Sequence, residues 1–573
     1  MTVVTHSRSR SPDLSMFRGS RLYLWLTALA LVLAVVSLHW PSTPSYDPYS
    51  WLIWGREIFQ TITGSGPVVD AHLHIAGGSS WKPLPVIFTT VFAAFGSAQP
   101  DLWLVVARAG AGLTVLMSVK LTVRITWGLV SQSRGGALLA EHSRLGRAMA
   151  VTPAVLAGAA ALICTTFTLH FPGNMMLGYS EGVMTAVFLI AVERAWDGHH
   201  RQAFALGIVP CLDRPEVWPV WAAYGLWLIW RDRAARQLVF GLGILMLALW
   251  VVPQELGGGS GGILGLPGHA LKNRSISSAA NTSFPFWNEL SKTLWPLVIE
   301  RLEIAALLLM ALSAHLLVRS RRRLGGWEAA LRRYPAAFAA SLAGLFGFLW
   351  WLGIAVETEL GFAGNPRYAV IGAMFVCVSG CAAYGWACIG LATLADRGLR
   401  WLGRRSRYGY RRSSSEQLVW LAGAATLVVL VVFALVPDRF TSTMPTLNSI
   451  RVQLRYQAEL RERFAALIER AGGARKVMAC GSVMTNNYQV TMLAWDLHVP
   501  IYYIQALARL PLVKAGPNVV FQTASSIGRP VYPAPVYMQN WARGWQQANG
   551  SRYTVTQDSP VTLYMNCSRY SRT

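Results

Sequence analysis

Six ionisable side chains lie at the edges of long apolar runs, where charge is costly unless it is paired or faces a water-filled cavity. They come from five separate stretches of the chain: Asp47, Lys82, Glu181, Arg214 with Glu216, and Arg367. Acids that face bases at a lipid boundary suit a reaction on a lipid-linked phosphate. The bases would hold the phosphate, and an acid would take a proton from an attacking hydroxyl.

Each of these residues also has a plainer explanation. Asp47 precedes a proline at the start of an aromatic-rich amphipathic stretch, a pattern that is equally typical of a helix N-terminus. Glu181 follows Ser180 and could cap a helix, and Lys82 could be a snorkelling anchor at the membrane surface. Arg367 could anchor its helix at the membrane interface or bind a phosphate. The segment from Asp213 to Glu216 could be an internal ion pair.

A second group of candidates is Asp70, His72 and His74, at alternate positions. On an extended strand all three side chains would share one face, so together they could ligate a divalent metal. Three such residues without a fourth ligand are a weak signal, and solvated loop residues explain them as well.

Composition excludes an ordinary soluble enzyme. The chain is 53% hydrophobic and only 14% charged, with a mean hydropathy of +0.37, whereas soluble domains carry about 25% charged residues. The formal charge of +24 would suggest nucleic-acid binding in a soluble protein. Here the arginines flank apolar runs, so they indicate positive-inside anchoring of a polytopic membrane protein and no nucleic-acid partner.

Hydropathy predicts eleven membrane spans and a cytoplasmic N-terminus in the plasma membrane. The spans are expected at 22–40, 102–130, 148–168, 181–196, 203–213, 217–230, 237–253, 299–318, 336–355, 368–393 and 418–437. Basic residues then fall in the cytoplasmic segments 131–147, 197–202, 231–236, 319–335 and 394–417. We expect 84–97 to be an external segment at the membrane edge, within a first external loop at 40–100. This topology places all six ionisable residues at or near the outer face.

The remainder of the chain, 438–573, has a mixed polar composition and is predicted to be an extracytoplasmic α/β domain after a membrane domain at 1–437. Arg451 to Ala471 reads as an amphipathic helix, and a second helix is expected at about 485–497. Strands are expected at Lys476–Cys480, Ile501–Gln505, Asn518–Gln522 and Val561–Cys567. The only external cysteines, Cys480 and Cys567, are predicted to form a disulfide.

In this arrangement the chain resembles the GT-C superfamily of polytopic glycosyltransferases, in particular the protein O-mannosyltransferases and lipid A aminoarabinose transferases. The matching features occur in order along 1–393: the first-loop acid Asp47, Lys82-Pro83, Arg108, the span-opening acid Glu181, Arg214-Pro215-Glu216 and Arg367-Tyr368. The resemblance implies a mainly α fold of eleven to thirteen helices and a polyprenyl-phosphate sugar donor.

Carried over to this chain, the resemblance makes Asp47 the catalytic base and assigns donor-phosphate binding to Lys82, Arg367 and Tyr368. Glu181, Arg214 and Glu216 become supporting cavity residues. Many relatives have paired acids in the first loop, but here Pro48 follows Asp47, so a partner acid would have to be Asp70 or Glu57. No cofactor is required, and a divalent metal is left open.

The function hypothesis is an inverting transfer of one sugar from a polyprenyl-phosphate donor to a hydroxyl of a glycan, lipid or protein on the extracytoplasmic face. The C-terminal domain is expected to bind the acceptor. Two alternatives remain open: a lipid or solute transporter whose buried Arg and Glu residues line a passage, and a non-catalytic scaffold or sensor. The sequence does not distinguish arabinofuranose from mannose donors.

Overall fold

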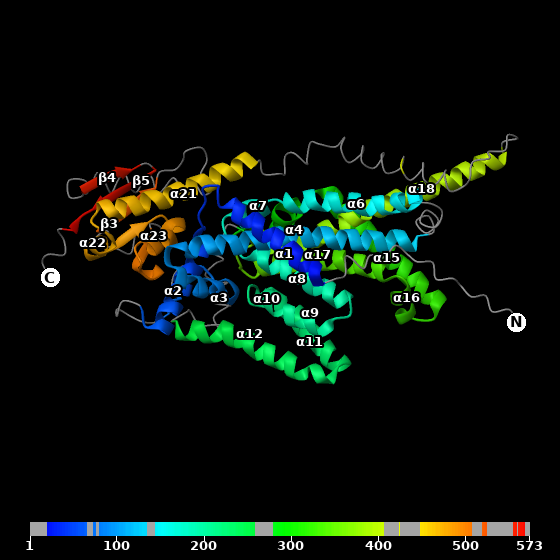
Figure 1. The fold of residues 1–573 in the computed structure, drawn as a ribbon, viewed down its shortest axis with the longest axis horizontal. Coiled ribbons are helices and arrows are strands. Elements are labelled where there is room, and N and C mark those ends of the chain that lie inside the picture. Colours follow the sequence, from blue (N-terminus) through cyan, green and yellow to red (C-terminus); the bar gives the residue numbers. More distant parts are fainter. Residues whose placement is uncertain are drawn as a thin grey trace.

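The computed structural model of the chain describes residues 20–65, 73–75, 79–133, 144–257, 279–405, 423, 447–506, 518–523, 554–558 and 560–567. Within them the fold is mainly helical, with one small sheet near the C-terminus. Figure 1 shows a long bundle of helices with the sheet domain at one end. The fold class predicted from the sequence is confirmed at this level.

The bundle consists of long, roughly aligned helices that pack mainly through α4 and α18 (Figure 1). Its members are α1 (Ser20–Ser37), α4 (Gln99–Gln132), α6 (Arg144–Thr166), α8 (Glu181–Trp196), α15 (Glu300–Leu324), α17 (Pro335–Glu359) and α18 (Val370–Arg405). Beside it lie α9 (His200–Leu206), α10 (Ile208–Cys211), α11 (Trp218–Arg231) and α12 (Arg236–Leu256), with α16 (Trp327–Arg333). Short connections are η3 (Pro215–Val217), η4 (Arg233–Ala235), α14 (Pro285–Asn288), η6 (Glu289–Leu294) and η7 (Trp295–Leu297).

The outer surface of the bundle is apolar. Leu226 and Trp230 on α11, and Phe240 and Ile244 on α12, are exposed large hydrophobic side chains, and α1 and α15 carry similar ones. Exposed apolar area on this scale marks contact with a membrane or a partner rather than with water. Five helical stretches among the described residues are long and apolar enough to cross a membrane: Pro83–Gln132, Arg233–Leu256, Glu300–Leu324, Pro335–Glu359 and Pro366–Leu394.

The structure does not confirm the expected count of eleven spans. Segment 203–213 is not one helix, because it divides into α9 and α10 at Gly207. The expected spans 181–196 and 217–230 correspond to α8 and α11, which have only 16 and 14 residues, shorter than the roughly 20 that an upright crossing needs. The last expected span, 418–437, lies outside the described residues apart from position 423.

The first loop contains two helices that pack on each other, α2 (Tyr46–Thr63) and α3 (Pro83–Phe92). Their backbones approach closely at Gly55, where an added Cβ would lie 2.6 Å from the backbone carbon of Thr89. The Thr89 hydroxyl donates a hydrogen bond to the carbonyl of Trp51, at 2.7 Å. After α3, the 3₁₀ helix η2 (Ala93–Ala98) turns at Gly96 into α4. The expected edge segment 84–97 is therefore helical and supports α2.

The C-terminal domain contains a five-stranded mixed sheet in the order β2-β1-β3-β5-β4. Its strands are β1 (Val483–Thr485), β2 (Ile504–Ala506), β3 (Val519–Thr523), β4 (Thr554–Asp558) and β5 (Val561–Met565). Strands β2, β1 and β3 are parallel, and β3, β5 and β4 are antiparallel. Its helical elements are α21 (Leu447–Arg470), α22 (Ala474–Ala479), η9 (Asn487–Gln489), α23 (Val490–Asp496) and η10 (Ile501–Tyr503).

Three sequence predictions for this domain were wrong. Ile501–Gln505 is not one strand, because its first three residues form η10 and only the end belongs to β2. Residues 476–480 belong mainly to α22 rather than to a strand, because Ala474, Lys476 and Met478 favour a helix and the segment is too short for periodicity to decide. The edge strand β4 was missed, since its residues are almost all exposed and give no apolar alternation. The amphipathic helix α21 is confirmed, and Cys480 and Cys567 form a disulfide.

The C-terminal domain packs against α2, as Figure 1 shows at the end of the bundle. Helix α23 supplies most of this contact. The guanidinium of Arg56 donates to the carbonyl of Trp495 at 3.2 Å and lies 4.6 Å from the centre of its ring. The Thr491 hydroxyl donates to the carbonyl of Tyr46 at 2.9 Å. The domain therefore contacts the N-terminal end and the middle of α2.

Candidate active site

A cluster of buried charges forms around the carboxylate of Glu181, the first residue of α8. Its Oε1 atom lies 3.0 Å from the Nζ of Lys82, 3.1 Å from Nη2 of Arg214 and 3.8 Å from Nε of Arg367. Glu181 is completely buried, and all three basic side chains are less than a tenth exposed. We call these four residues the Glu181 cluster. One carboxylate oxygen thus gathers three positive charges from three distant parts of the chain.

Asp47 joins this cluster through Arg367. Nη2 of Arg367 forms a close ion pair with Oδ2 of Asp47. Asp47 lies in the first turn of α2 but is not the N-cap, which is Ser45 and makes no side-chain capping hydrogen bond. Its side chain is more exposed than that of Arg367, at 13% against 9%. Asp47 therefore lies at the edge of the cluster, in contact with one of its three cations.

Two further acids border the cluster, Asp213 in the turn after α10 and Glu216 in η3. Oδ2 of Asp213 is 3.5 Å from Nζ of Lys82, and Oε1 of Glu216 is 3.0 Å from Nη1 of Arg214. The Lys82 ammonium also donates to the hydroxyl of Ser180, at 3.2 Å. Since Ser180 is engaged in this way and makes no capping hydrogen bond, Ser180 and Glu181 serve the cluster rather than the end of the helix.

The local backbone explains how these residues meet. Gly178 adopts φ +87°, a conformation that side chains disfavour, and turns the chain between α7 (Phe171–Met176) and α8. The indole of Trp103 donates to its carbonyl at 2.8 Å. The backbone N–H of Leu84 donates to the carbonyl of Leu212 at 3.0 Å, which fixes the Lys82 segment to the turn that carries Asp213.

Arg108, one of the residues that carry the resemblance, has a positioning role in this structure. From α4 its guanidinium donates to the hydroxyl of Ser37 at 2.9 Å, to that of Ser42 at 2.7 Å and to the carbonyl of Met176 at 2.8 Å. It therefore joins the end of α1 to the segment before α8. A neighbouring backbone hydrogen bond, from Ser45 to Leu177 at 3.0 Å, continues this connection to the start of α2.

Aromatic rings cover the guanidinium groups. The Arg214 guanidinium carbon lies 3.5 Å from the ring centre of Tyr368, and that of Arg367 lies 4.3 Å from the ring of Tyr179. Arg367 and Tyr368 belong to η8 (Pro366–Ala369), whose first turn is capped by the side chain of Asn365. Stacking of this kind orients the planar guanidinium groups and leaves their edges for hydrogen bonding.

Several of these edges have no partner. Nε of Arg214, and Nε and Nη1 of Arg367, are buried and make no hydrogen bond to any described residue. A buried donor without a partner costs about 1–3 kcal/mol, so such atoms are suited to an additional acceptor. Phosphate oxygens match guanidinium edges in charge and geometry. The cluster can therefore hold a phosphate next to Asp47.

The structure does not bring Glu57 to the cluster. Glu57 is ten residues beyond Asp47 on the same helix, a rise of about 15 Å. Its Oε2 accepts the backbone N–H of His74 at 3.0 Å, and burial raises its pKa to about 7.

The ring of His74, one of the candidate metal ligands, lies 5.0 Å from the ring of Tyr502. Asp70 and His72 lie outside the described residues, and the described part of the chain contains no group of three or more potential metal ligands.

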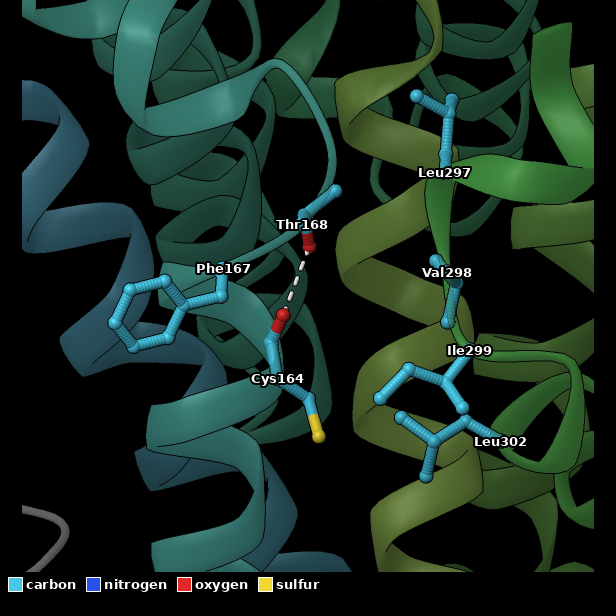
Figure 2. Close-up of a pocket in the computed structure, with 7 residues that line it drawn as sticks. All are labelled: Cys164, Phe167, Thr168, Leu297, Val298, Ile299 and Leu302. Atoms are coloured by element: carbon cyan, nitrogen blue, oxygen red, sulfur yellow. Dashed lines mark hydrogen bonds between the residues drawn. The ribbon is translucent and has the colours of Figure 1, made fainter. Parts of the chain in front are cut away.

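A small pocket elsewhere in the bundle is separate from this cluster. Figure 2 shows its seven lining residues, which come from the end of α6 and the segment leading into α15: Cys164, Phe167, Thr168, Leu297, Val298, Ile299 and Leu302. The hydroxyl of Thr168 donates to the carbonyl of Cys164 at 3.0 Å. No member of the Glu181 cluster lines this pocket.

A second buried ion network lies at the other end of α8. Glu193 accepts from Lys120 at 2.7 Å and from the hydroxyl of Tyr23 at 2.7 Å, and it forms a close ion pair with Arg124. Arg124 also pairs with Asp197 at 2.7 Å. Glu193 is twelve residues from Glu181, about 18 Å along the helix. This network joins α1, α4 and α8. Sequence reasoning missed it, although Lys120, Arg124 and Glu193 lie inside predicted spans, where a charge needs a partner.

The site contains residues that the sequence did not single out. Asp213 was noted only as part of a charged turn, and Ser180 only as a helix cap. The signal that could have found Asp213 is its position beside Arg214 between two apolar runs, because an acid buried at that depth needs a cation. The ring of Tyr179 gave no signal, since its role depends on packing against Arg367.

Fold and site together define a polytopic helical membrane protein with a buried charge cluster beside its C-terminal domain. No protein-family model and no curated protein matches the chain. Two solved structures are similar to it: ArnT from Cupriavidus metallidurans bound to undecaprenyl phosphate, with a TM-score of 0.43, and the same protein in the apo state, with a TM-score of 0.41. In each case identity is 14%, and the alignment covers 95% of this chain and 98% of the other.

Proposed function

We propose that this chain is a membrane glycosyltransferase that moves a sugar from a polyprenyl-phosphate donor to an acceptor hydroxyl on the extracytoplasmic face. The observation that carries the proposal is the meeting of three buried cations on Glu181, with Asp47 held beside them by Arg367. The free guanidinium edges of Arg214 and Arg367 would receive the phosphate.

In the proposed reaction Asp47 accepts the proton of the acceptor hydroxyl. The hydroxyl oxygen forms a bond to the anomeric carbon on the side opposite the phosphate, so the configuration inverts. The bond between the anomeric carbon and the phosphate oxygen breaks, and its electron pair leaves with the polyprenyl phosphate. Lys82, Arg214 and Arg367 stabilise that negative charge, and Tyr368 keeps Arg214 in place.

The three cations of the site are paired with acids of the protein until a ligand arrives. Lys82, Arg214 and Arg367 contact Glu181, Asp47, Glu216 and Asp213. A phosphate would compete for Arg367 and free Asp47 to contact the acceptor.

We place residues 1–437 in the catalytic membrane domain and 438–573 in the acceptor-binding domain, with the N-terminus in the cytoplasm.

The test is sugar transfer by purified protein in liposomes, using labelled polyprenyl-phosphate arabinofuranose and mannose with short glycan acceptors. We expect product from one donor, at a rate that Asp47→Asn lowers about 10²- to 10⁴-fold. The matched control is Asp101→Asn, which changes an exposed acid in the first turn of α4. Protein-dependent movement of labelled lipid between leaflets without product would favour the transporter hypothesis instead.

A further inference from the structure

A polar and aromatic surface lies beside the start of α2. Its residue on α2 is Tyr46, which precedes Asp47 in the sequence. The rings of Tyr46 on α2 and Tyr488 in η9 meet edge to face, with their centres 6.4 Å apart and an interplanar angle of 80°. Tyr488 is 50% exposed. The two tyrosines come from the membrane domain and the C-terminal domain, so this surface exists only when the two are packed together.

The residues on either side of Tyr488 carry unused hydrogen-bond acceptors. Oδ1 of Asn487 and Oε1 of Gln489 are buried and make no hydrogen bond to any described residue. The whole Gln489 residue is only 7% exposed. By contrast, the side-chain amide of Asn486 donates to the hydroxyl of Thr523. A buried amide oxygen without a donor is costly, so the two oxygens are suited to an external hydroxyl.

These groups match the chemistry of a sugar. The face of a tyrosine ring is electron-rich and packs against the C–H groups on one side of a pyranose or furanose ring. Amide carbonyl oxygens accept hydrogen bonds from sugar hydroxyls. An acyl chain would cover the tyrosines but leave both amide oxygens unpaired.

We propose that Tyr46, Asn487, Tyr488 and Gln489 form a binding subsite for a glycan acceptor. The proposal rests on the function proposed above and specifies its acceptor class. A sugar unit against Tyr46 and Tyr488 would lie at the first turn of α2, which carries Asp47, so that the next unit of the glycan chain could present a hydroxyl to Asp47. The contact of Arg56 with Trp495 would keep the two halves of the subsite together.

The experiment measures binding of short linear oligomers of arabinofuranose, of mannose and of N-acetylglucosamine to the full-length protein in nanodiscs. We expect one oligomer to bind, with Tyr488→Ala and Gln489→Leu each weakening binding about tenfold and Tyr488→Phe changing it less than about threefold, because the ring is kept. Tyr503→Ala, which removes another exposed tyrosine of the same domain, should bind normally. Retained binding of polyprenyl phosphate by all variants shows that they are folded.

The outcomes separate this inference from the proposed function. If no transfer is seen but oligomer binding depends on Tyr488, the subsite stands and the proposed function fails. If transfer occurs and Tyr488→Ala leaves the acceptor KM unchanged, the subsite is wrong and the function stands. Binding of none of the oligomers, or Tyr488-dependent binding of a serine-containing peptide instead, would also overturn the subsite.

Discussion

Replacing Arg367 with lysine separates the charge of this residue from its guanidinium geometry. Arg367 pairs with Asp47 through one nitrogen, approaches Glu181 through another and keeps Nε and Nη1 without hydrogen bonds. A lysine retains the positive charge but cannot hold Asp47 and a phosphate with separate atoms of one rigid group. Loss of one charge-assisted hydrogen bond costs about 1.5–3 kcal/mol, which corresponds to about 10- to 150-fold weaker binding of polyprenyl phosphate.

The assay is equilibrium binding of polyprenyl phosphate to purified protein in nanodiscs. Arg124→Lys is the matched control, because Arg124 is also a buried arginine between two carboxylates but lies in the network at the far end of α8. We expect Arg367→Lys to weaken binding within the stated range and Arg124→Lys to leave it unchanged. Equal effects of the two variants, or no effect of Arg367→Lys, would refute the assignment of Arg367 to the phosphate.

Two further predictions concern stability. Glu181→Gln should lower the free energy of unfolding by about 3–5 kcal/mol, seen as a lower thermal midpoint, because three buried cations lose their shared carboxylate; an unchanged midpoint would contradict the role of Glu181. Asp496, beside Arg461 and Arg56, has its pKa raised to about 7 by burial. The folded protein therefore binds a proton that the unfolded chain has lost, so packing of the C-terminal domain should weaken as pH rises from about 4 to 7. Limited proteolysis against pH should show this trend, and it should be smaller in Asp496→Asn.

The membership of the charge cluster could be predicted from the sequence because burial of charge beside apolar runs is costly wherever it occurs. Arginine distribution then placed Asp47, Lys82 and Arg367 on one face. What the sequence could not give is the central place of Glu181, since a residue at the start of a helix has the same local pattern whether it caps the helix or gathers cations. That difference depends on contacts with segments more than 30 residues away.

Elements with a strong periodic signal were predicted well, as α21 and the long spans show. Short elements were not predicted well. The helix α22 and the strand β4 have too few residues for periodicity to distinguish helix from strand, and β4 buries almost nothing. The packing of α23 on α2 was also out of reach, because Arg56 and Trp495 are 439 residues apart and nothing in either local sequence indicates its partner.

The most direct test of the account compares transfer with donor binding in one variant, Asp47→Asn. If Asp47 is the base and the basic residues hold the donor, the variant should lose transfer by about 10²- to 10⁴-fold while binding polyprenyl phosphate at least as well as the wild type, since Arg367 is released from its acidic partner. Near-normal transfer by Asp47→Asn would contradict the account.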